Sequence, residues 1–199
     1  SVREWAVGGN CLGLSAPVYF CLLRLLVLSM VRYFMSMAES PPVSNGSPSM
    51  KPRLMVVMGV SGSGKSSIAS SLANALNATY LDADDYHSAT NIDKMIRGEA
   101  LTDADRWPWL ENFAAIMVDQ KTMAVGACSA LRTKYRQCIV TAAGEPVLFV
   151  YLDGRKSLIR QRMLQRKAHF MPDSLLDSQF ETLGPPETDE LAISVDIQG

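Results

Sequence analysis

Two patterns of apolar positions alternate along residues 51–199. Short continuous apolar runs, which are typical of buried strands, occur at residues 54–58, 79–81, 123–128, 146–152 and 191–197. Helices are predicted between and around them, at residues 65–76, 89–97, 105–119, 132–142, 155–167 and 175–180. Because strands that alternate with helices build parallel sheets, the pattern predicts an α/β fold with helices on both faces of the sheet.

The first part of the chain, residues 1–37, has a different pattern. Residues 17–35 are mostly apolar, but Arg24 and Arg32 interrupt them, so the uncharged stretch is short for a membrane span. Three interpretations stay open: a marginal membrane anchor, an organelle-targeting segment, since residues 17–35 lack acids, or a leader outside the working protein. The last fits Met37, which has the features of a natural start.

The chain divides into an extension, a linker and one domain. Residues 38–50 are rich in Pro, Ser, Asn and Gly, which predicts a flexible linker. Residues 51–199 are long enough for a single domain.

Composition narrows the function classes. The 199 residues are 48% hydrophobic and 20% charged with a net charge of −1, which argues against disorder and against binding of duplex nucleic acid. The four cysteines and two histidines show no disulfide or zinc-ligand spacing. A reducing, cytoplasmic location is therefore the default, with targeting or anchoring through residues 17–35 as the alternative.

A glycine-rich phosphate-loop motif follows the first strand. The pattern G-x-x-x-x-G-K-[ST] predicts backbone N–H groups that surround phosphates, a lysine on the β- and γ-phosphates and a hydroxyl on magnesium. The structural alternative is that the motif is a glycine-rich turn that matches the pattern by chance and binds no nucleotide. The guanine-reading Asn-Lys-x-Asp is absent, so a compact phosphotransferase or a nucleotide-binding module without chemistry remains. The residues expected to hold the nucleotide phosphates are Gly59, Val60, Ser61, Gly62, Ser63, Gly64, Lys65, Ser66 and Ser67.

An acidic turn follows the second strand. Open parallel sheets bind ligands beyond the carboxyl ends of their strands, where Asp82 and Asp84 should lie beside the phosphate loop. Two carboxylates there could divide the orientation of an acceptor hydroxyl and the support of magnesium. An acidic helix cap is the structural alternative, to which we assign Asp85.

The residues also resemble a known family, the gluconate kinases, over residues 54–197. The similarity lies in MGVSGSGKS at 58–66, LDADDYH at 81–87, LTDADRWPWL at 101–110, CSAL at 128–131 and QFETL at 179–183. The combination is far more specific than the phosphate loop alone. It implies a P-loop NTPase fold like that of shikimate and adenylate kinases, with a lid, and ATP-dependent phosphorylation of D-gluconate at its 6-hydroxyl.

The resemblance also implies roles for single residues. Lys65 and Ser66 would bind ATP and magnesium, Asp84 would be the base that orients the acceptor, and Asp82 would be a magnesium-side carboxylate. His87 would bind substrate hydroxyls, although a structural role is equally compatible with it.

Arginines complete the expected site. Arg106 would hold the sugar-acid carboxylate, unless it pairs with Asp103 or Asp105. Arg162 and Arg166 share one helix face and would meet the transferring phosphoryl group from the lid, unless that face is merely solvated.

Other motif residues receive structural roles. We expect Trp107 and Trp109 to pack at a helix start, with Pro108 in its first turn, and Cys128 to be an unreactive packing residue.

The end of the chain departs from the family pattern. The family carries a further helix after the last strand, whereas this chain stops at Gly199. We expect an uncovered sheet face, and hence low stability and uncertain activity. The rival functions are a kinase of another small hydroxylated acceptor and a truncated nucleotide-binding product without turnover. We expect a small-molecule substrate and no nucleic-acid or membrane partner, with a homodimer left open.

Overall fold

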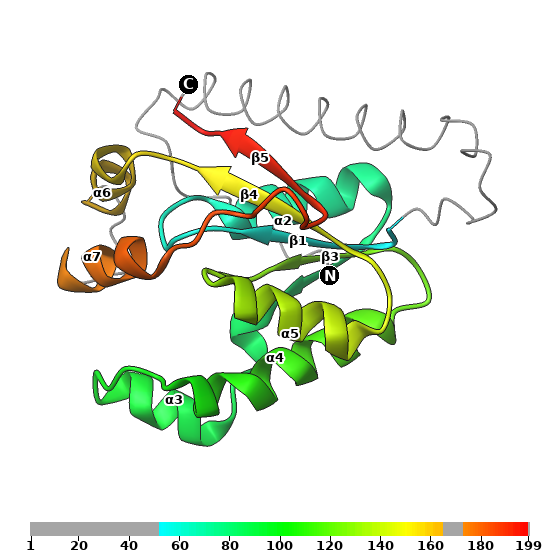
Figure 1. Ribbon diagram of the computed structural model, residues 1–199, viewed down its shortest axis with the longest axis horizontal. Coiled ribbons are helices and arrows are strands. Elements are labelled where there is room, and N and C mark those ends of the chain that lie inside the picture. The colour runs from blue at the N-terminus through cyan, green and yellow to red at the C-terminus, as the bar shows by residue number, and fades with distance from the viewer. Residues whose placement is uncertain (1–51, 165–172, 199) are drawn as a thin grey trace, which may run out of the picture.

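The computed structural model describes residues 52–164 and 173–198 of the chain (Figure 1). The extension, the linker and Arg166 of the expected lid lie outside these residues, so their predictions are not tested. Within the described ranges no helix combines the length and the apolar character needed to cross a membrane.

The described residues form a five-stranded parallel sheet in the order β2-β3-β1-β4-β5. Its strands are β1 Leu54–Met58, β2 Thr79–Asp82, β3 Ala124–Ala127, β4 Val147–Asp153 and β5 Ala192–Asp196. The helices are α2 Lys65–Leu76, α3 Ala89–Ile96, α4 Asp103–Val118, α5 Thr133–Ala143, α6 Lys156–Leu164 and α7 Asp173–Thr182, and a 3₁₀ turn, η1, spans Ala83–Tyr86. Each strand and helix that the sequence predicted is present, which confirms the α/β fold.

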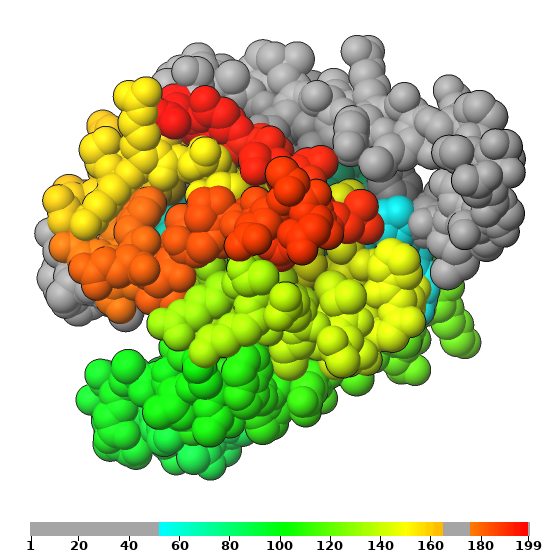
Figure 2. Space-filling view, viewed as in Figure 1, coloured from blue at the N-terminus to red at the C-terminus, as the bar shows by residue number. Residues whose placement is uncertain are grey.

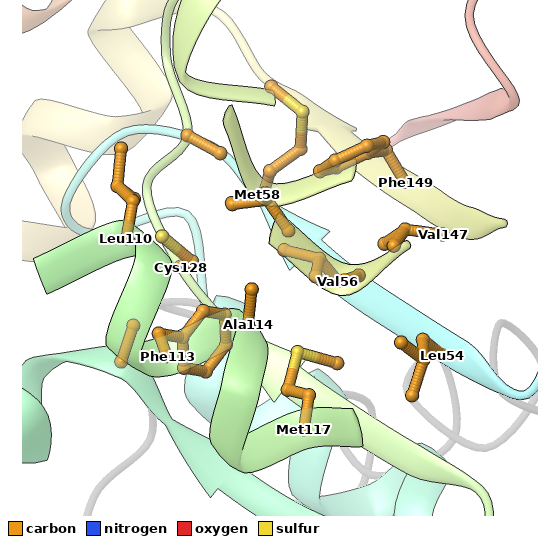
Figure 3. Close-up of a cluster of buried hydrophobic side chains, with 14 of the residues drawn as sticks. Leu54, Val56, Met58, Leu110, Phe113, Ala114, Met117, Cys128, Val147 and Phe149 are labelled. Carbon is orange, nitrogen blue, oxygen red and sulfur yellow. The ribbon is translucent and has the colours of Figure 1, made fainter. Parts of the chain in front are cut away.

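Successive residues of β1 divide the core between the two faces of the sheet. Leu54, Val56 and Met58 pack in one apolar cluster with α4 and α5, part of which Figure 3 shows. Met55 and Val57 belong to the opposite cluster, with buried side chains of α2, α6 and α7. Both faces of the strand are buried because helices cover both sides, and this explains the uninterrupted apolar run in the sequence.

A close approach of α4 to the sheet requires a glycine in β3. A Cβ added at Gly126 would lie 2.5 Å from Cζ of Phe113, which is fully buried. We infer that the glycine lets the α4 aromatic ring rest directly on the strand backbone.

Helix α4 begins earlier than predicted. Thr102 and Asp105 form a capping box, in which the Thr102 hydroxyl accepts from Asp105 N and the Asp105 carboxylate accepts from Thr102 N at 2.8 Å. The helix therefore starts at Asp103, and Pro108 lies inside it rather than in its first turn. That part of the prediction was wrong, because the cap lies upstream of the apolar spacing.

Helix α3 and its flanking turns project from the lower end of the domain in both views (Figures 1 and 2). Ser88 caps this helix by accepting a hydrogen bond from Asn91 N at 3.1 Å. At the other edge of the sheet, Ile193 and Val195 of β5 are only half-buried. The expected low stability of the chain stays a prediction.

Candidate active site

Three loops with chemical signals leave neighbouring strands at the same edge of the sheet. Strand β3 lies between β1 and β2, with Ala127 in register with both Val57 and Asp82. The phosphate loop after β1 and the acidic turn after β2 therefore flank the loop that follows β3. Backbone contact joins the first and last of these loops, because Gly59 N donates to Ser129 O at 3.3 Å.

The phosphate loop has the backbone geometry that an anion site needs. Gly62 and Gly64 have φ values of 85° and 93°, and a Cβ on Gly62 would lie 2.8 Å from Cγ of Met163 in α6. Helix α2 begins at Lys65 with no acidic residue in its first turn and no side-chain cap. Its free N–H groups and positive end are therefore available to phosphate.

Side chains of the loop also fit a bound nucleotide. Ser63 is buried, and its hydroxyl has no hydrogen-bond partner among the described residues. Lys65 is half-buried and Ser66 is exposed at the start of α2. An unpaired buried hydroxyl is costly, so a phosphate oxygen beside the loop is a natural partner for Ser63. Val60 is buried in the core and supports the loop from behind.

Gln179 of α7 holds the phosphate loop through two hydrogen bonds. The sequence by itself predicted no role for this residue. Ser61 N donates to Gln179 Oε1 at 2.7 Å, and Gln179 Nε2 lies 3.1 Å from Ser61 Oγ. The two residues are 118 positions apart in the chain. The only signal for Gln179 was its place in the family motif QFETL.

We expect Gln179→Ala to raise the KM for ATP by about fivefold to tenfold, because each hydrogen bond that orients the loop contributes roughly 1 kcal/mol. The KM for the acceptor should not change. Steady-state kinetics with each substrate varied in turn measures both, and Gln137→Ala, an exposed glutamine on α5, is the matched control. Equal ATP KM values in Gln179→Ala and the control would refute the assignment.

The acidic turn places Asp82 beside the start of α2. One Asp82 oxygen accepts from Asp84 N at 3.2 Å, and the other accepts from the Tyr80 hydroxyl at 2.9 Å. The Ser66 hydroxyl lies near enough to the Tyr80 phenol to lower its pKa slightly. Burial, with the nearby Asp82, raises the pKa of Tyr80 well above its usual range, so the phenol keeps its proton.

Oxygen donors at this position fit magnesium. Ser66 and Asp82 both lie beside Tyr80, and hydroxyl and carboxylate oxygens are the ligands that Mg²⁺ takes. Within residues 52–164 and 173–198 no group of three or more acidic, His or Cys side chains could form a protein cage for a metal.

The residues expected to bind the acceptor belong to the acidic turn and to the start of α4: Asp84 lies in η1, His87 directly follows it and Arg106 lies near the start of α4. Asp84 is exposed in η1, and His87 stacks on Trp109 with ring centroids 4.1 Å apart. Burial lowers the pKa of His87, while Asp84 raises it and Arg106 lowers it further, so both charges act on the imidazole. His87 lines a cavity of about 530 Å³ together with Asn91, Asp105 and Trp109 among others, whereas Asp84 and Arg106 are not among the residues that line it.

The two tryptophans pack as predicted. Trp109 is buried and donates from Nε1 to Ala83 O at 2.7 Å, which ties α4 to the acidic turn. Trp107 meets the ring of Tyr135 edge-on, with centroids 5.6 Å apart. Asp105 pairs with Lys94 of α3 at 2.7 Å. These contacts hold η1, α3, α4 and α5 in one assembly.

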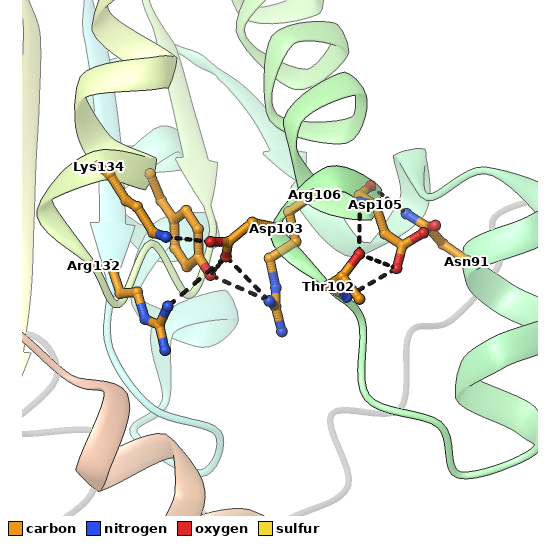
Figure 4. A network of polar contacts seen from close by, with 8 residues as sticks. Asn91, Thr102, Asp103, Asp105, Arg106, Arg132 and Lys134 are labelled. Carbon is orange, nitrogen blue, oxygen red and sulfur yellow. Dashed lines mark hydrogen bonds and ion pairs between the residues drawn. The ribbon is translucent and has the colours of Figure 1, made fainter.

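Arg106 takes part in a polar cluster at the starts of α4 and α5, which is drawn in Figure 4. Its guanidinium lies 3.8 Å from Asp103 and donates to the Tyr135 hydroxyl at 3.2 Å. The expected alternative, an ion pair with Asp103, is therefore present as a long contact. Arg106 stays about one third exposed, so part of its guanidinium is accessible to a ligand.

The structure places Arg162 differently from the expectation of a lid residue. Its side chain is buried, and Nη2 donates to Ile197 O at 2.7 Å. In this arrangement the guanidinium holds the end of β5, because α6 packs that face against the domain. Its contact with the phosphoryl group stays a prediction, as does that of Arg166.

The cysteine at the end of β3 behaves as a packing residue. Cys128 is fully buried, and burial raises the pKa of its thiol to about 12. A thiol of this kind is protonated at neutral pH and is a poor nucleophile. This agrees with the predicted unreactive role.

Comparisons with known proteins identify the family. The model of a family described as an AAA domain matches residues 54–186. The chain is 42% identical over 161 residues to a probable gluconokinase of Xenopus tropicalis. The alignment covers 72% of this chain and 85% of that protein. It is 46% identical over 151 residues to the thermoresistant gluconokinase of Escherichia coli K12, with 72% and 85% covered.

Solved structures give the same answer. A gluconokinase from Sinorhizobium meliloti 1021 superposes with a TM-score of 0.68 and 42% identity over 73% of this chain and 83% of its own. The APS kinase CysC of Mycobacterium tuberculosis, at 19% identity and a TM-score of 0.52, covers 73% and 90% and shares the fold. The phosphate loop is therefore part of a nucleotide-binding kinase fold, and the chain belongs to the gluconokinase family.

Proposed function

We propose that this protein transfers the γ-phosphoryl group of ATP to the 6-hydroxyl of D-gluconate. The observation that carries the proposal is the position of Asp84, which is exposed on the turn after β2, two strands from the phosphate loop. The hydrogen bond from Trp109 to Ala83 O joins this turn to α4, the helix that carries Arg106. A carboxylate between a phosphate donor site and a cationic acceptor site suits the phosphorylation of a sugar acid. The identity of 40–47% to several proteins named as gluconokinases supports the same substrate.

The residues divide the reaction between them. The acceptor hydroxyl loses its proton to Asp84 while its oxygen forms a bond to the γ-phosphorus, and the bond from that phosphorus to the bridging oxygen breaks, which releases ADP. Lys65 and the loop N–H groups stabilise the negative charge on the transferring group. Arg106 holds the carboxylate end of the acceptor, and His87 orients its hydroxyls.

We propose Ser66 and Asp82 as the residues that hold magnesium with the nucleotide. When bound, the ion neutralises charge on the β- and γ-phosphates. The protonated phenol of Tyr80 keeps the Asp82 carboxylate in place by donating to it at 2.9 Å.

The test is ADP release by the full chain with ATP, magnesium and a panel of acceptors: D-gluconate, D-glucitol, D-glucose and shikimate. We expect ADP release that depends on gluconate and saturates with it, with little release for the neutral polyol and sugar. Preferential turnover of another acceptor would overturn the substrate assignment. Nucleotide binding without acceptor-dependent release would support the non-catalytic alternative.

A further inference from the structure

The loop that follows β3 leads directly into a group of basic side chains. Arg132 and Lys134 lie at the start of α5 and face Asp103 and Arg106 at the start of α4 (Figure 4). We name Arg106, Arg132, Lys134, Asp103 and Tyr135 the basic cluster. It contains three positive charges against the one carboxylate of Asp103.

The carboxylate within the basic cluster is already occupied by two short contacts. Asp103 accepts from the Tyr135 hydroxyl at 2.6 Å and from the Lys134 ammonium. Both arginines lie 3.8 Å from Asp103 Oδ1, beyond hydrogen-bond distance. Asp103 therefore aligns the arginines without taking up their donors.

Arg132 is the least committed member. It is 44% exposed, and within residues 52–164 and 173–198 its guanidinium makes the long contact to Asp103 and lies over the Tyr135 ring at 5.9 Å. Figure 4 shows the guanidinium groups of Arg132 and Arg106 to the left and right of the Asp103 carboxylate, with both lying below it in that view. Two planar forks directed to one side suit a carboxylate, which accepts paired N–H bonds.

The backbone before Arg132 is built rigidly. Ala130 has a φ of 42°, an uncommon conformation for a residue with a side chain. Arg136, fully buried, donates to Ala130 O at 3.1 Å and to Gly184 O at 3.0 Å. Strained backbone held by surrounding contacts is typical of functional sites. The loop thereby fixes the point from which Arg132 leaves the sheet edge.

The position of this loop decides which ligand the basic cluster can meet. The loop follows β3, which lies between β1, the strand before the phosphate loop, and β2, the strand that ends at Asp82. Arg132 therefore follows a strand that lies between the phosphate-donor loop and the turn of the proposed base. Arg106, its neighbour in the cluster, directly follows Asp105 near the start of α4, and Asp105 lines the same cavity as His87. The cluster is thus on the acceptor side of the site.

We propose that Arg132, with Arg106 and assisted by Lys134, binds the carboxylate of the acceptor and makes the enzyme selective for sugar acids over neutral polyols. This assignment rests on the proposed function and adds the residues that determine its specificity. Arg106 alone supplies one guanidinium group, whereas Arg106 and Arg132 together supply two, from the starts of α4 and α5. Selectivity for sugar acids then follows, because a neutral acceptor adds no negative charge to the basic cluster and leaves its excess positive charge uncompensated.

The test is steady-state kinetics of Arg132→Gln with D-gluconate and with D-glucitol, a polyol of equal chain length. We expect the KM for gluconate to rise by about tenfold to a hundredfold, since a charge-assisted hydrogen bond is lost. The KM for ATP and the rate with D-glucitol should not change. Arg132→Lys should recover part of the loss, because charge returns without the fork.

Arg97→Gln is the matched control, since Arg97 is also exposed and paired with a carboxylate, that of Glu99, away from the cluster. It should leave the gluconate KM unchanged. An unchanged gluconate KM in Arg132→Gln overturns the proposal. A change confined to kcat or to the KM for ATP also overturns it, because Arg132 would then act on the phosphoryl group.

Direct binding separates this proposal from the proposed function. Calorimetric titration of D-gluconate into the wild-type chain and into Arg132→Gln, with a nonhydrolysable ATP analogue present, needs no turnover. Binding that weakens in the variant supports the carboxylate site even if the wild type releases no ADP with gluconate. Equal binding, or none in the wild type, overturns it.

Discussion

Replacing Asp84 by asparagine should lower gluconate-dependent kcat by about a hundredfold to ten-thousandfold, the usual contribution of a positioned general base. The amide has the same shape but cannot take the acceptor proton. Within the described residues the Asp84 side chain makes no hydrogen bond, and it is exposed, so the fold should tolerate the change. ADP release at saturating substrates measures the effect.

The adjacent residue provides a stringent control for Asp84. Asp85 is exposed on the same 3₁₀ turn, and Asp85→Asn makes the same chemical change one position along the chain. It should keep kcat close to that of the wild type. Equal losses in both variants would mean that the turn contributes general negative charge, and the assignment of the base to Asp84 would fail.

Replacing Lys65 by methionine should lower kcat by about a hundredfold to a thousandfold, comparable to the removal of one preorganised donor from a transition state. Lys65 begins α2 directly after the glycines of the loop, and no acidic residue in the first turn neutralises it. Its ammonium is therefore available to the β- and γ-phosphates. The affinity for ATP, measured with a fluorescent nucleotide, should fall as well.

A lysine at the opposite end of the sheet controls for loss of positive charge. Lys121 is exposed just before β3, at the amino end of the strand. Lys121→Met should bind nucleotide and turn over gluconate as the wild type does. Wild-type kcat in Lys65→Met would show that the lysine does not act on the phosphates, and the loop would then be a binding element alone.

Local patterns in the sequence were sufficient for the elements and for the donor site. The apolar run that forms β1, the glycines after it and Lys65 are contiguous, so the phosphate loop depends on backbone preferences over a few residues. The alternation of strands and helices also determined a parallel sheet, because parallel strands need crossover connections. The predicted start of α4 was wrong by two residues, because the Thr102 cap is a side-chain contact that the spacing of apolar residues does not reveal.

The burial and contacts of the arginines could not be predicted from local sequence patterns. Arg162 lies inside the predicted helix 155–167 and Arg132 at the start of the predicted helix 132–142. In the structure Arg162 is buried on the carbonyl of Ile197, whereas Arg132 is exposed beside Asp103. Their difference comes from which helix face packs on the sheet. That is a property of tertiary packing, which short-range spacing does not encode.

By itself, the sequence determined the fold class, the phosphate loop and the presence of an acidic turn, because each depends on neighbouring residues. Only the tertiary structure decided what surrounds them: the strand order that puts β3 between donor and acceptor loops, and the contact of Gln179 with Ser61 across 118 positions. It also decided the meeting of the α4 and α5 starts in the basic cluster. These features depend on long-range burial and strand order, in which residues distant in the chain become neighbours only when the sheet and its covering helices pack together.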